Sequence, residues 1–312
     1  MISTGSAQYV LITPARNEQA FIADVIEGVV GQTIKPARWV IVDDRSIDRT
    51  AEIIELYLPK NSFIRLLRIK GDGARHCGKK AAAFNAGLEV LGGIDYSYIG
   101  NLDADIKLPP AYYETILHKF ATEPRLGLAG GTVNTKAGNR IVRLDAAPDS
   151  VPGAVQLFRK DCFESIGGRY LPLELGGLDA AAEIMARMNG WIVRQFQDVT
   201  AQEQRRMGTS DGTDSLTARY REGACFHALG YGTLFYLIRS LYKMKYWPWI
   251  IGSLAAVAGF LLARMKRVPI ALPREVVTYL RREQRRKLAS LLSLKPSLAP
   301  YYINPDRKQD LG

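Results

Sequence analysis

The sequence predicts an α/β fold, with helices flanking a sheet, followed by a helical appendage. Apolar runs at residues 8–13, 39–42 and 64–69 alternate with amphipathic helical patterns, as in βαβ units. The runs at 39–42 and 98–102 end in acidic residues. Beyond residue 213 the chain becomes aromatic, apolar and basic. We therefore expect an α/β domain over residues 1–213 and a helical region over residues 214–312.

Composition limits the classes of protein to consider. The 312 residues are 47% hydrophobic and 23% charged, which excludes a disordered chain. The net charge of +11 favours phosphate-bearing ligands, nucleic acid or an anionic membrane surface. Cys77, Cys162 and Cys225 are too scattered for a disulfide framework or a zinc site, which indicates a reducing compartment. The first residues lack a signal-peptide pattern, so we expect the first domain in the cytoplasm.

The first elements follow from hydrophobic periodicity. Residues 8–13 predict a buried strand that Pro14 stops. A helix follows, with apolar residues at helical spacing: Phe21, Ile22, Val25, Ile26 and Val29. Strands at 39–42 and 64–69 enclose a second helix around residues 53–56. These units make half of a nucleotide-binding α/β sheet.

A basic, glycine-rich loop at residues 71–80 precedes a predicted helix at 81–88. Backbone amides at the helix start, together with Lys79, would form an anion site. The loop is not a P-loop, because Lys80 stands where Ser or Thr is required. A solvated basic loop is the ordinary alternative.

Two aspartates follow the predicted strand that ends near Leu102. Carboxylates at the carboxyl end of a buried strand lie where open α/β sheets bind ligands. Asp103 and Asp105 could together hold Mg²⁺ or Mn²⁺ and leave positions open for phosphate oxygens. The alternative is a turn in which Asp only caps the backbone.

The next stretch completes the predicted sheet. We expect a helix at 111–120, strands at 126–131, 153–159 and 190–193, and a polar connection at 135–150. Asp179 opens a helix over 180–189, where it could act only as an N-cap. The neighbouring Gly176 and Gly177 would let a substrate approach closely.

Taken in order, five segments resemble the family 2 glycosyltransferases of the GT-A fold, a Rossmann-like nucleotide-binding mixed sheet. The segments are residues 13–18, 42–50, 78–88 and 103–105, and Gly177-Leu178-Asp179 with Gly190-Trp191 downstream. Each motif is weak alone, but five in order with sensible spacing are specific. The resemblance covers residues 8–210.

The resemblance implies a role for each matching position. The residues expected to contact the nucleotide or its diphosphate are Pro14, Arg16, Glu18, Asp44, Lys79, Asn85 and Asp103. Arg205 and Arg206 could form a basic loop that closes over the diphosphate, and the alternative is an exposed charged turn. Asp44 would contact the uracil or ribose. Asp103 and Asp105 would meet the ribose and a Mg²⁺ or Mn²⁺ ion. Asp179 falls where the family places the base that deprotonates the acceptor hydroxyl.

The resemblance also implies the reaction, an inverting, metal-dependent transfer of a sugar from a nucleotide-diphosphate donor, with UDP-sugar favoured over GDP-sugar. The sequence departs from the family pattern at two positions that bear on this expected reaction. Leu178 stands where the family carries a second acidic residue, which weakens the expectation for acceptor binding. Arg206 replaces the Trp of the Gln-x-x-Arg-Trp motif, which argues against a long-chain synthase.

Residues 246–263 form an uncharged run of the minimal length for a membrane span, with Trp247 and Trp249 at one end. A single span would place the basic tail outside, against the positive-inside rule. We therefore favour a re-entrant or interfacial hairpin over residues 224–263, with the tail on anionic lipid. A buried helical pair in a soluble protein is the alternative. The expected location is the inner membrane, with the catalytic domain on the cytoplasmic side. The resemblance to the family then implies a lipid-linked acceptor in surface-polysaccharide synthesis.

Three other classes of protein were weighed. A sugar nucleotidyltransferase should carry a glycine-rich loop after its first strand, where this chain has Pro14-Ala15-Arg16. An inactive membrane scaffold has only Leu178 in its favour. Nucleic-acid binding is disfavoured, because the basic residues lie beside an apolar segment with no base-stacking platform.

Overall fold

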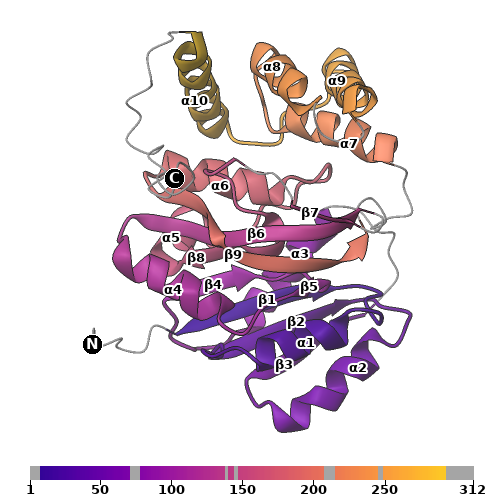
Figure 1. Cartoon of the computed structure of the whole chain (residues 1–312), viewed down its shortest axis with the longest axis vertical. Helices are drawn as coiled ribbons and strands as arrows, with labels where there is room; N and C mark the ends of the chain where they lie inside the picture. The colour runs from indigo at the N-terminus through magenta and orange to yellow at the C-terminus, as the bar shows by residue number, and fades with distance from the viewer. Residues whose placement is uncertain are drawn as a thin grey trace, which may run out of the picture.

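A computed structural model describes residues 8–70, 78–137, 140–143, 147–206, 215–244 and 249–292. Among these residues a mixed sheet runs in the order β3-β2-β1-β4-β8-β6-β9-β5, and β7 pairs with β6 (Figure 1). The strands are β1 Tyr9–Ala15, β2 Arg38–Asp44, β3 Ile64–Ile69, β4 Tyr98–Asn101, β5 Ile106–Lys107, β6 Leu126–Ala137, β7 Arg140–Arg143, β8 Leu157–Arg159 and β9 Ile192–Arg206. Strands β3, β2, β1 and β4 are mutually parallel.

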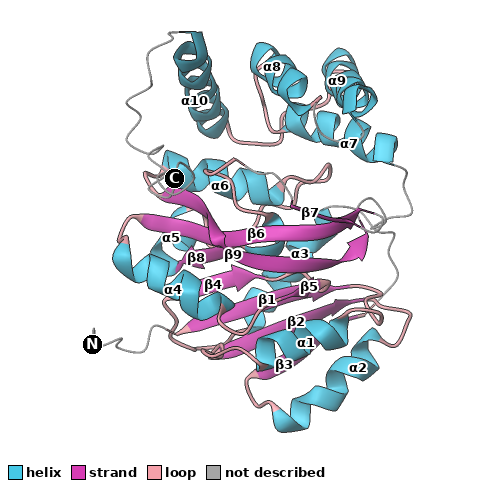
Figure 2. Ribbon diagram, in the orientation of Figure 1, coloured by secondary structure: helices cyan, strands magenta, loops and turns pink. Residues whose placement is uncertain are grey.

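Helices cover both faces of the sheet, and a further group lies beyond helix α6 (Figure 2). The sheet helices are α1 Ile22–Val30, α2 Thr50–Tyr57, α3 Gly78–Val90, α4 Tyr112–Thr122, α5 Lys160–Ser165 and α6 Leu178–Met188, with short 3-10 turns at Leu58–Lys60 and Gly153–Val155. The further group is α7 Ser215–Ala228, α8 Thr233–Lys243, α9 Trp249–Met265 and α10 Arg274–Leu292.

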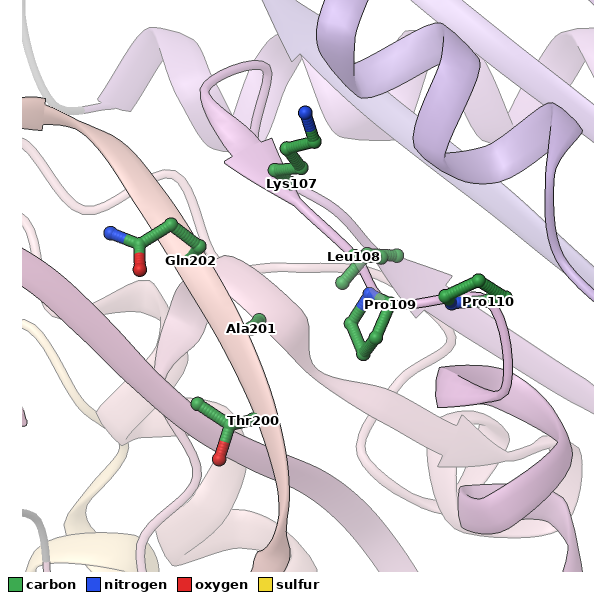
Figure 3. A pocket seen from close by; sticks show the side chains of 7 residues that line it. All are labelled: Lys107, Leu108, Pro109, Pro110, Thr200, Ala201 and Gln202. Atoms are coloured by element: carbon green, nitrogen blue, oxygen red, sulfur yellow. The ribbon is translucent and has the colours of Figure 1, made fainter.

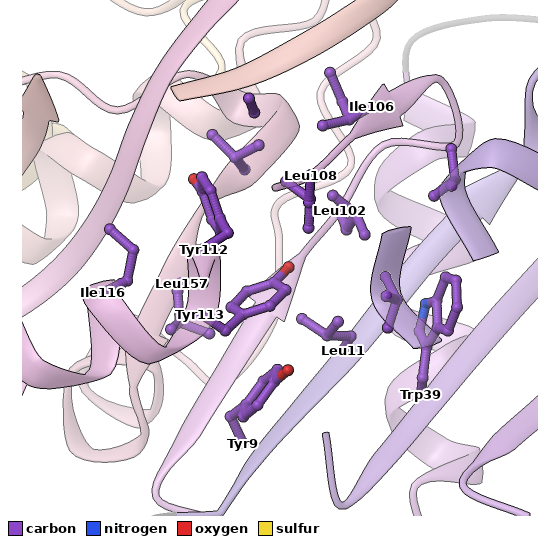
Figure 4. Packing of buried hydrophobic residues seen from close by; sticks show 14 of the residues in the cluster. Tyr9, Leu11, Trp39, Leu102, Ile106, Leu108, Tyr112, Tyr113, Ile116 and Leu157 are labelled. Atoms are coloured by element: carbon purple, nitrogen blue, oxygen red, sulfur yellow. The ribbon is translucent and has the colours of Figure 1, made fainter. Parts of the chain in front are cut away.

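Strand β1 divides its side chains between two hydrophobic cores, because successive residues of a strand point to opposite faces. Tyr9 and Leu11 pack with α1 and α4 (Figure 4). Val10 and Ile12 pack with α3, α5 and α6 on the other face. This double burial explains why the strand is an almost continuous apolar run in the sequence.

Three expectations for the sheet were wrong. Pro14 does not stop β1, which continues to Ala15 with Pro14 opposite Val42, since the fixed φ of proline suits an extended chain. Gly153–Val155 is a 3-10 turn, and only Leu157–Arg159 is strand. The polar segment at 135–150 carries strand β7 and the end of β6, which form an antiparallel pair.

Strand β9 is also much longer than the predicted 190–193. It runs beside β6 with register shifts, one of them between Gly131 and Thr132, that break the alternating pattern expected of a strand. Arg205 therefore lies on a strand and not on the loop that the sequence suggested.

The C-terminal helices pack on the α6 side of the sheet. A small core joins α6 and α10 through Ala181, Ile184, Val276 and Leu280. No helix within the described ranges combines the length and apolar character that crossing a membrane requires. The segment predicted as one hairpin is divided among α7, α8 and α9, and residues 245–248 lie outside the described residues.

Candidate active site

The predicted site lies where the strand order reverses. Strand β1 has β2 on one side and β4 on the other, and all three are parallel, so their carboxyl ends meet at one edge. Open α/β sheets bind ligands at such a switch point. Glu18 follows β1, Asp44 ends β2, and Asp103 and Asp105 follow β4. The topology thus brings four predicted site residues to one edge.

The loops after β1 and β2 are joined by hydrogen bonds. The Asn17 amide donates to Ser46 Oγ at 3.0 Å, and the Glu18 amide donates to Thr50 Oγ1 at 2.7 Å. Asn17 and Arg45 have φ values of 55° and 60°, which non-glycine residues rarely adopt. Such conformations persist only where neighbouring contacts impose them. The two loops are therefore held together as one side of the predicted site.

Asp44, predicted to contact the uracil or ribose, is buried and forms an ion pair with the Arg45 guanidinium. Its neighbour Asp43 accepts a hydrogen bond from the Ser46 amide at 3.1 Å. Pro14 lies within β1, and Arg16 is half-buried directly after it.

Arg205 joins the two sides of the switch point. Its Nε donates to Asp105 Oδ2 at 3.0 Å, and its terminal nitrogen donates to Glu18 Oε2. The guanidinium also lies over the Phe21 ring, 5.1 Å from the centroid. Burial and the Asp103 carboxylate raise the pKa of Asp105, while Arg205 opposes that rise. Arg205 therefore holds Glu18 and Asp105 in place.

Asp103 is held by Lys80 and Asn101. Lys80 Nζ lies 2.7 Å from Oδ1 and 2.8 Å from Oδ2, and Asn101 Nδ2 donates to Oδ1 at 3.0 Å. Burial disfavours the charged ammonium, but Asp103, with Asp179 and Asp105 further away, holds the pKa of Lys80 above its usual value. Lys80 is therefore a cation between the carboxylates.

The donor set fits a metal that a substrate helps to hold. No three His, Cys, Asp or Glu side chains of the described residues gather around one point. Mg²⁺ is commonly held by one or two carboxylates together with substrate phosphates. Asp103 and Asp105 could supply those two carboxylates, and the buried Asn101 Oδ1 beside them has no hydrogen-bond partner within the described part of the chain.

Asp179 packs directly against the 3-10 turn Gly153–Val155. A Cβ placed on Gly153 would lie 2.6 Å from Asp179 Oδ2. The Gly153 carbonyl accepts a hydrogen bond of 2.6 Å from Asn101 Nδ2, the amide that also contacts Asp103. One turn therefore separates Asp103, a predicted metal ligand, from the predicted base.

Glu183 is a residue that the sequence reasoning missed. It lies one helical turn after Asp179, is 5% exposed, and accepts a hydrogen bond of 2.7 Å from the Val151 amide. Burial raises the pKa of Glu183 to about 8, with Arg187 opposing and Asp179 adding to the rise. The four-residue spacing from Asp179 was the available signal, but Val151 is distant in sequence.

The remaining predicted residues have different surroundings. Asn85 Nδ2 donates to the Tyr170 carbonyl at 2.9 Å, and Asn85 Oδ1 accepts from the Tyr170 amide at 3.0 Å. The amide thus fixes the segment before α6, and its contact with a donor stays a prediction. The side chains of Lys79 and Arg206, and the loop at 71–77, lie outside the described residues.

An open hollow of about 370 Å³ lies beside this edge, between β9 and the chain after β5 (Figure 3). Its lining residues are Lys107, Leu108, Pro109, Pro110, Thr200, Ala201 and Gln202. Among the predicted site residues whose side chains are described, none lines the hollow.

Comparison with known proteins identifies the family. The family model for glycosyl transferase family 2 matches residues 10–178, which hold β1 through the start of α6. The chain belongs to this family.

Curated relatives match over parts of their length. The uncharacterized glycosyltransferase EpsJ of Bacillus subtilis is 27% identical over 38% of this chain, and YibD of Escherichia coli is 30% identical over 38%. The poly-β-1,6-N-acetyl-D-glucosamine synthase of Staphylococcus aureus is 24% identical over 57%. The matches span 32% of each of the first two proteins and 45% of the synthase.

Solved structures share the fold. The mannosyltransferase PcManGT of Pyrobaculum calidifontis, in complex with GDP-Man and Mn²⁺, aligns with a TM-score of 0.53 at 15% identity, over 92% of this chain and 81% of its own. TarS 1–349 of S. aureus with UDP-GlcNAc aligns with a TM-score of 0.51 at 15% identity, over 83% and 73%. The mixed sheet flanked by helices is thus of the type found in these glycosyltransferases.

Proposed function

We propose that this protein is an inverting glycosyltransferase that uses a nucleotide-diphosphate sugar, with a UDP-sugar preferred, and a Mg²⁺ or Mn²⁺ ion. The acceptor is a membrane-associated, lipid-linked glycan of cell-surface polysaccharide synthesis. The protein acts at the inner membrane with its catalytic domain on the cytoplasmic side.

One observation carries the proposal: the gathering of Glu18, Asp44, Asp103 and Asp105 at the switch point, with Asp179 one turn away across Gly153. Such an edge suits a nucleotide whose diphosphate meets a metal, and the separate carboxylate suits an acceptor hydroxyl.

Each residue then has a chemical task. Asp179 accepts the proton of the acceptor hydroxyl as its oxygen attacks the anomeric carbon. The bond from that carbon to the diphosphate oxygen breaks, and the nucleoside diphosphate leaves with the electron pair. A metal at Asp103 and Asp105 would supply charge neutralisation of this leaving group. Lys80 adds a fixed positive charge beside the same carboxylates.

The comparisons support the substrate classes. TarS was solved with UDP-GlcNAc and PcManGT with GDP-Man and Mn²⁺, so both nucleotides and a divalent metal occur among proteins of this fold. The synthase of S. aureus is named for a sugar polymer. The exposed apolar residues of α8 and α9 support the membrane location.

Calorimetry tests the donor site. We expect UDP to bind with Mn²⁺ present, more tightly than GDP, and to lose affinity with EDTA or in Asp105→Ala. Asp198→Ala is the matched control, because Asp198 is an exposed aspartate paired with Lys119. Failure of the well-folded native protein to bind either nucleotide would reject the transferase. Tighter GDP binding would reassign the donor.

A further inference from the structure

Helices α8 and α9 each present a row of large apolar side chains to the outside. On α8 the exposed residues recur at helical spacing, with Leu234 65%, Ile238 37% and Leu241 61% exposed. We call the whole set the α8–α9 apolar face, made up of Leu234, Ile238, Leu241, Tyr242, Ile250, Ile251, Leu254, Leu261, Leu262 and Met265. Large exposed apolar patches mark interaction sites.

Helix α9 exposes large apolar residues and buries mostly small ones, apart from Phe260, which is buried and stacks on Tyr236 of α8. Ser253, Ala256 and Ala263 are buried, while Ile251 and Leu254 are 64% and 56% exposed. In water, an amphipathic helix is more stable with the opposite arrangement, in which the large apolar residues pack against the protein.

The buried side of α9 meets α7 at backbone distance. A Cβ on Gly223 of α7 would collide with the Ala256 carbonyl, and one on Gly259 would collide with the Tyr220 carbonyl. Close helix packing through small residues is the pattern of helices that lie in lipid, where large apolar side chains are satisfied outside.

The charge of this region indicates which surface the face meets. The sequence has no Asp or Glu between Glu222 and Glu275. It has basic residues there instead: Arg239, Lys243, Lys245, Arg264, Lys266, Arg267 and Arg274. Arg239 and Lys243 lie 4.0 and 3.3 Å from Glu222, so this carboxylate partly balances them. Arg264, Lys266 and Arg267 are exposed at the end of α9 and complement anionic lipid headgroups.

The described part of α9 is short for a membrane span. Its 17 residues rise about 25 Å, at about 1.5 Å per residue, against a hydrocarbon core of about 30 Å. Its apolar face with a basic margin is typical of an interfacial helix.

We propose that the α8–α9 apolar face docks this protein on an anionic phospholipid bilayer, with both helices lying in the interface. What this docking implies for catalysis rests on the proposed function. A Cβ on Gly177, two residues before Asp179, would lie 2.8 Å from Cys225 Sγ of α7, and α7 packs on α9. One helix therefore separates the lipid surface from the proposed base, so a lipid-linked acceptor is delivered beside Asp179.

The test is co-sedimentation of the full chain with vesicles of phosphatidylcholine, with and without phosphatidylglycerol. We expect binding to the anionic vesicles, weakened by roughly tenfold or more in Leu241→Gln/Leu254→Gln, since each buried leucine contributes strongly to transfer from water. Leu56→Gln is the matched control, because Leu56 is 74% exposed but lies on α2. Lys266→Gln/Arg267→Asn should remove the preference for anionic lipid; Asn suits position 267, whose φ is 55°.

Native protein that binds UDP but not anionic vesicles would refute the docking face and leave the donor site intact. Vesicle binding without UDP binding would refute only the proposed function. Sedimentation velocity tests a second outcome that would overturn the docking face, which is self-association. A native dimer that Leu241→Gln/Leu254→Gln converts to monomer, with no vesicle binding, would make this face a contact between two copies.

Discussion

Lys80 Nζ lies 2.7 Å from Asp103 Oδ1 and 2.8 Å from Asp103 Oδ2, so one ammonium contacts both oxygens of the first proposed metal carboxylate. The sequence pointed to Lys79 as the cation of this segment, and that stays a prediction because the Lys79 side chain lies outside the described residues. The neighbouring Lys80, which the sequence reasoning did not single out, contacts Asp103. Lys80 balances Asp103, and under the proposed function it would also supply a charge for a phosphate.

We expect Lys80→Met to weaken binding of a nucleotide-diphosphate sugar by about tenfold or more, because a charge-assisted hydrogen bond contributes roughly 1.5–3 kcal/mol. Calorimetry with UDP-sugar and Mn²⁺ measures this effect. Lys35→Met is the control, since Lys35 is exposed. Unchanged donor affinity together with tighter Mn²⁺ binding would show that Lys80 only balances the carboxylates.

Much of the sheet could be predicted because its parallel strands are buried on both faces. Val40, Ile41 and Val42 are fully buried, so their burial appears in the sequence as an apolar run that ends at Asp43. The site residues at these strand ends could be found for the same reason.

The antiparallel part of the sheet could not be predicted in this way. Strand β9 carries charged residues such as Asp198 and Glu203 and shifts register against β6, so neither an apolar run nor strict alternation identifies it. The contacts of Arg205 could not be predicted from the sequence either. Its partners Glu18 and Asp105 are far away in the sequence and come near only when β9 lies beside β5.

Arg205→Met should destabilise the fold by roughly 3 kcal/mol, because removing one partner of a buried ion pair leaves the other charge unpaired. Glu18 and Asp105 side chains are 9% and 15% exposed and both lose their cation. Urea denaturation measures the free energy of unfolding. The comparison variant is Arg49→Met, whose pair with Glu52 is exposed and should contribute about 0–1 kcal/mol. Equal losses in the two variants would contradict a structural role for Arg205.

Glu183 should make stability depend on pH in a defined direction. Its pKa is raised to about 8, so the folded protein keeps a proton that the unfolded chain loses above its ordinary pKa of 4.5. The contribution of Glu183 to the free energy of unfolding is therefore fully present below about pH 4.5 and is lost as the pH rises toward 8. The charged and titratable neighbours that set this pKa are Asp179 and Arg187 on α6, and Tyr170 and Tyr231 lie within electrostatic range.

We expect Glu183→Gln to remove most of this dependence, amounting to a few kcal/mol between pH 5 and 8, at about 1.4 kcal/mol per unit of pKa shift. Glutamine keeps an oxygen for the Val151 amide, so the fold should survive. Urea denaturation at the two pH values provides the measurement. Glu52→Gln, an exposed control, should retain the native pH dependence. An unaltered slope in Glu183→Gln would mean that Glu183 is ionised in the folded protein.

Gly153→Ala tests whether the position of Asp179 matters separately from donor binding. The new Cβ would lie 2.6 Å from Asp179 Oδ2 and 2.8 Å from its Cβ, so the carboxylate must move. A displacement of about 1 Å at a catalytic group can cost roughly a hundredfold in rate. We expect kcat for sugar transfer to fall by about that factor.

The affinity for UDP in Gly153→Ala should stay near the native value, since Asp44 and Asp105 are not displaced by the new methyl group. Calorimetry and initial rates on the same preparation separate the two effects, and Asp179→Asn gives the reference for complete loss of the proposed base. If Gly153→Ala instead lost UDP binding while keeping its kcat, the turn at Gly153 would belong to the donor site. Asp179 would then no longer be the residue on which the turn acts.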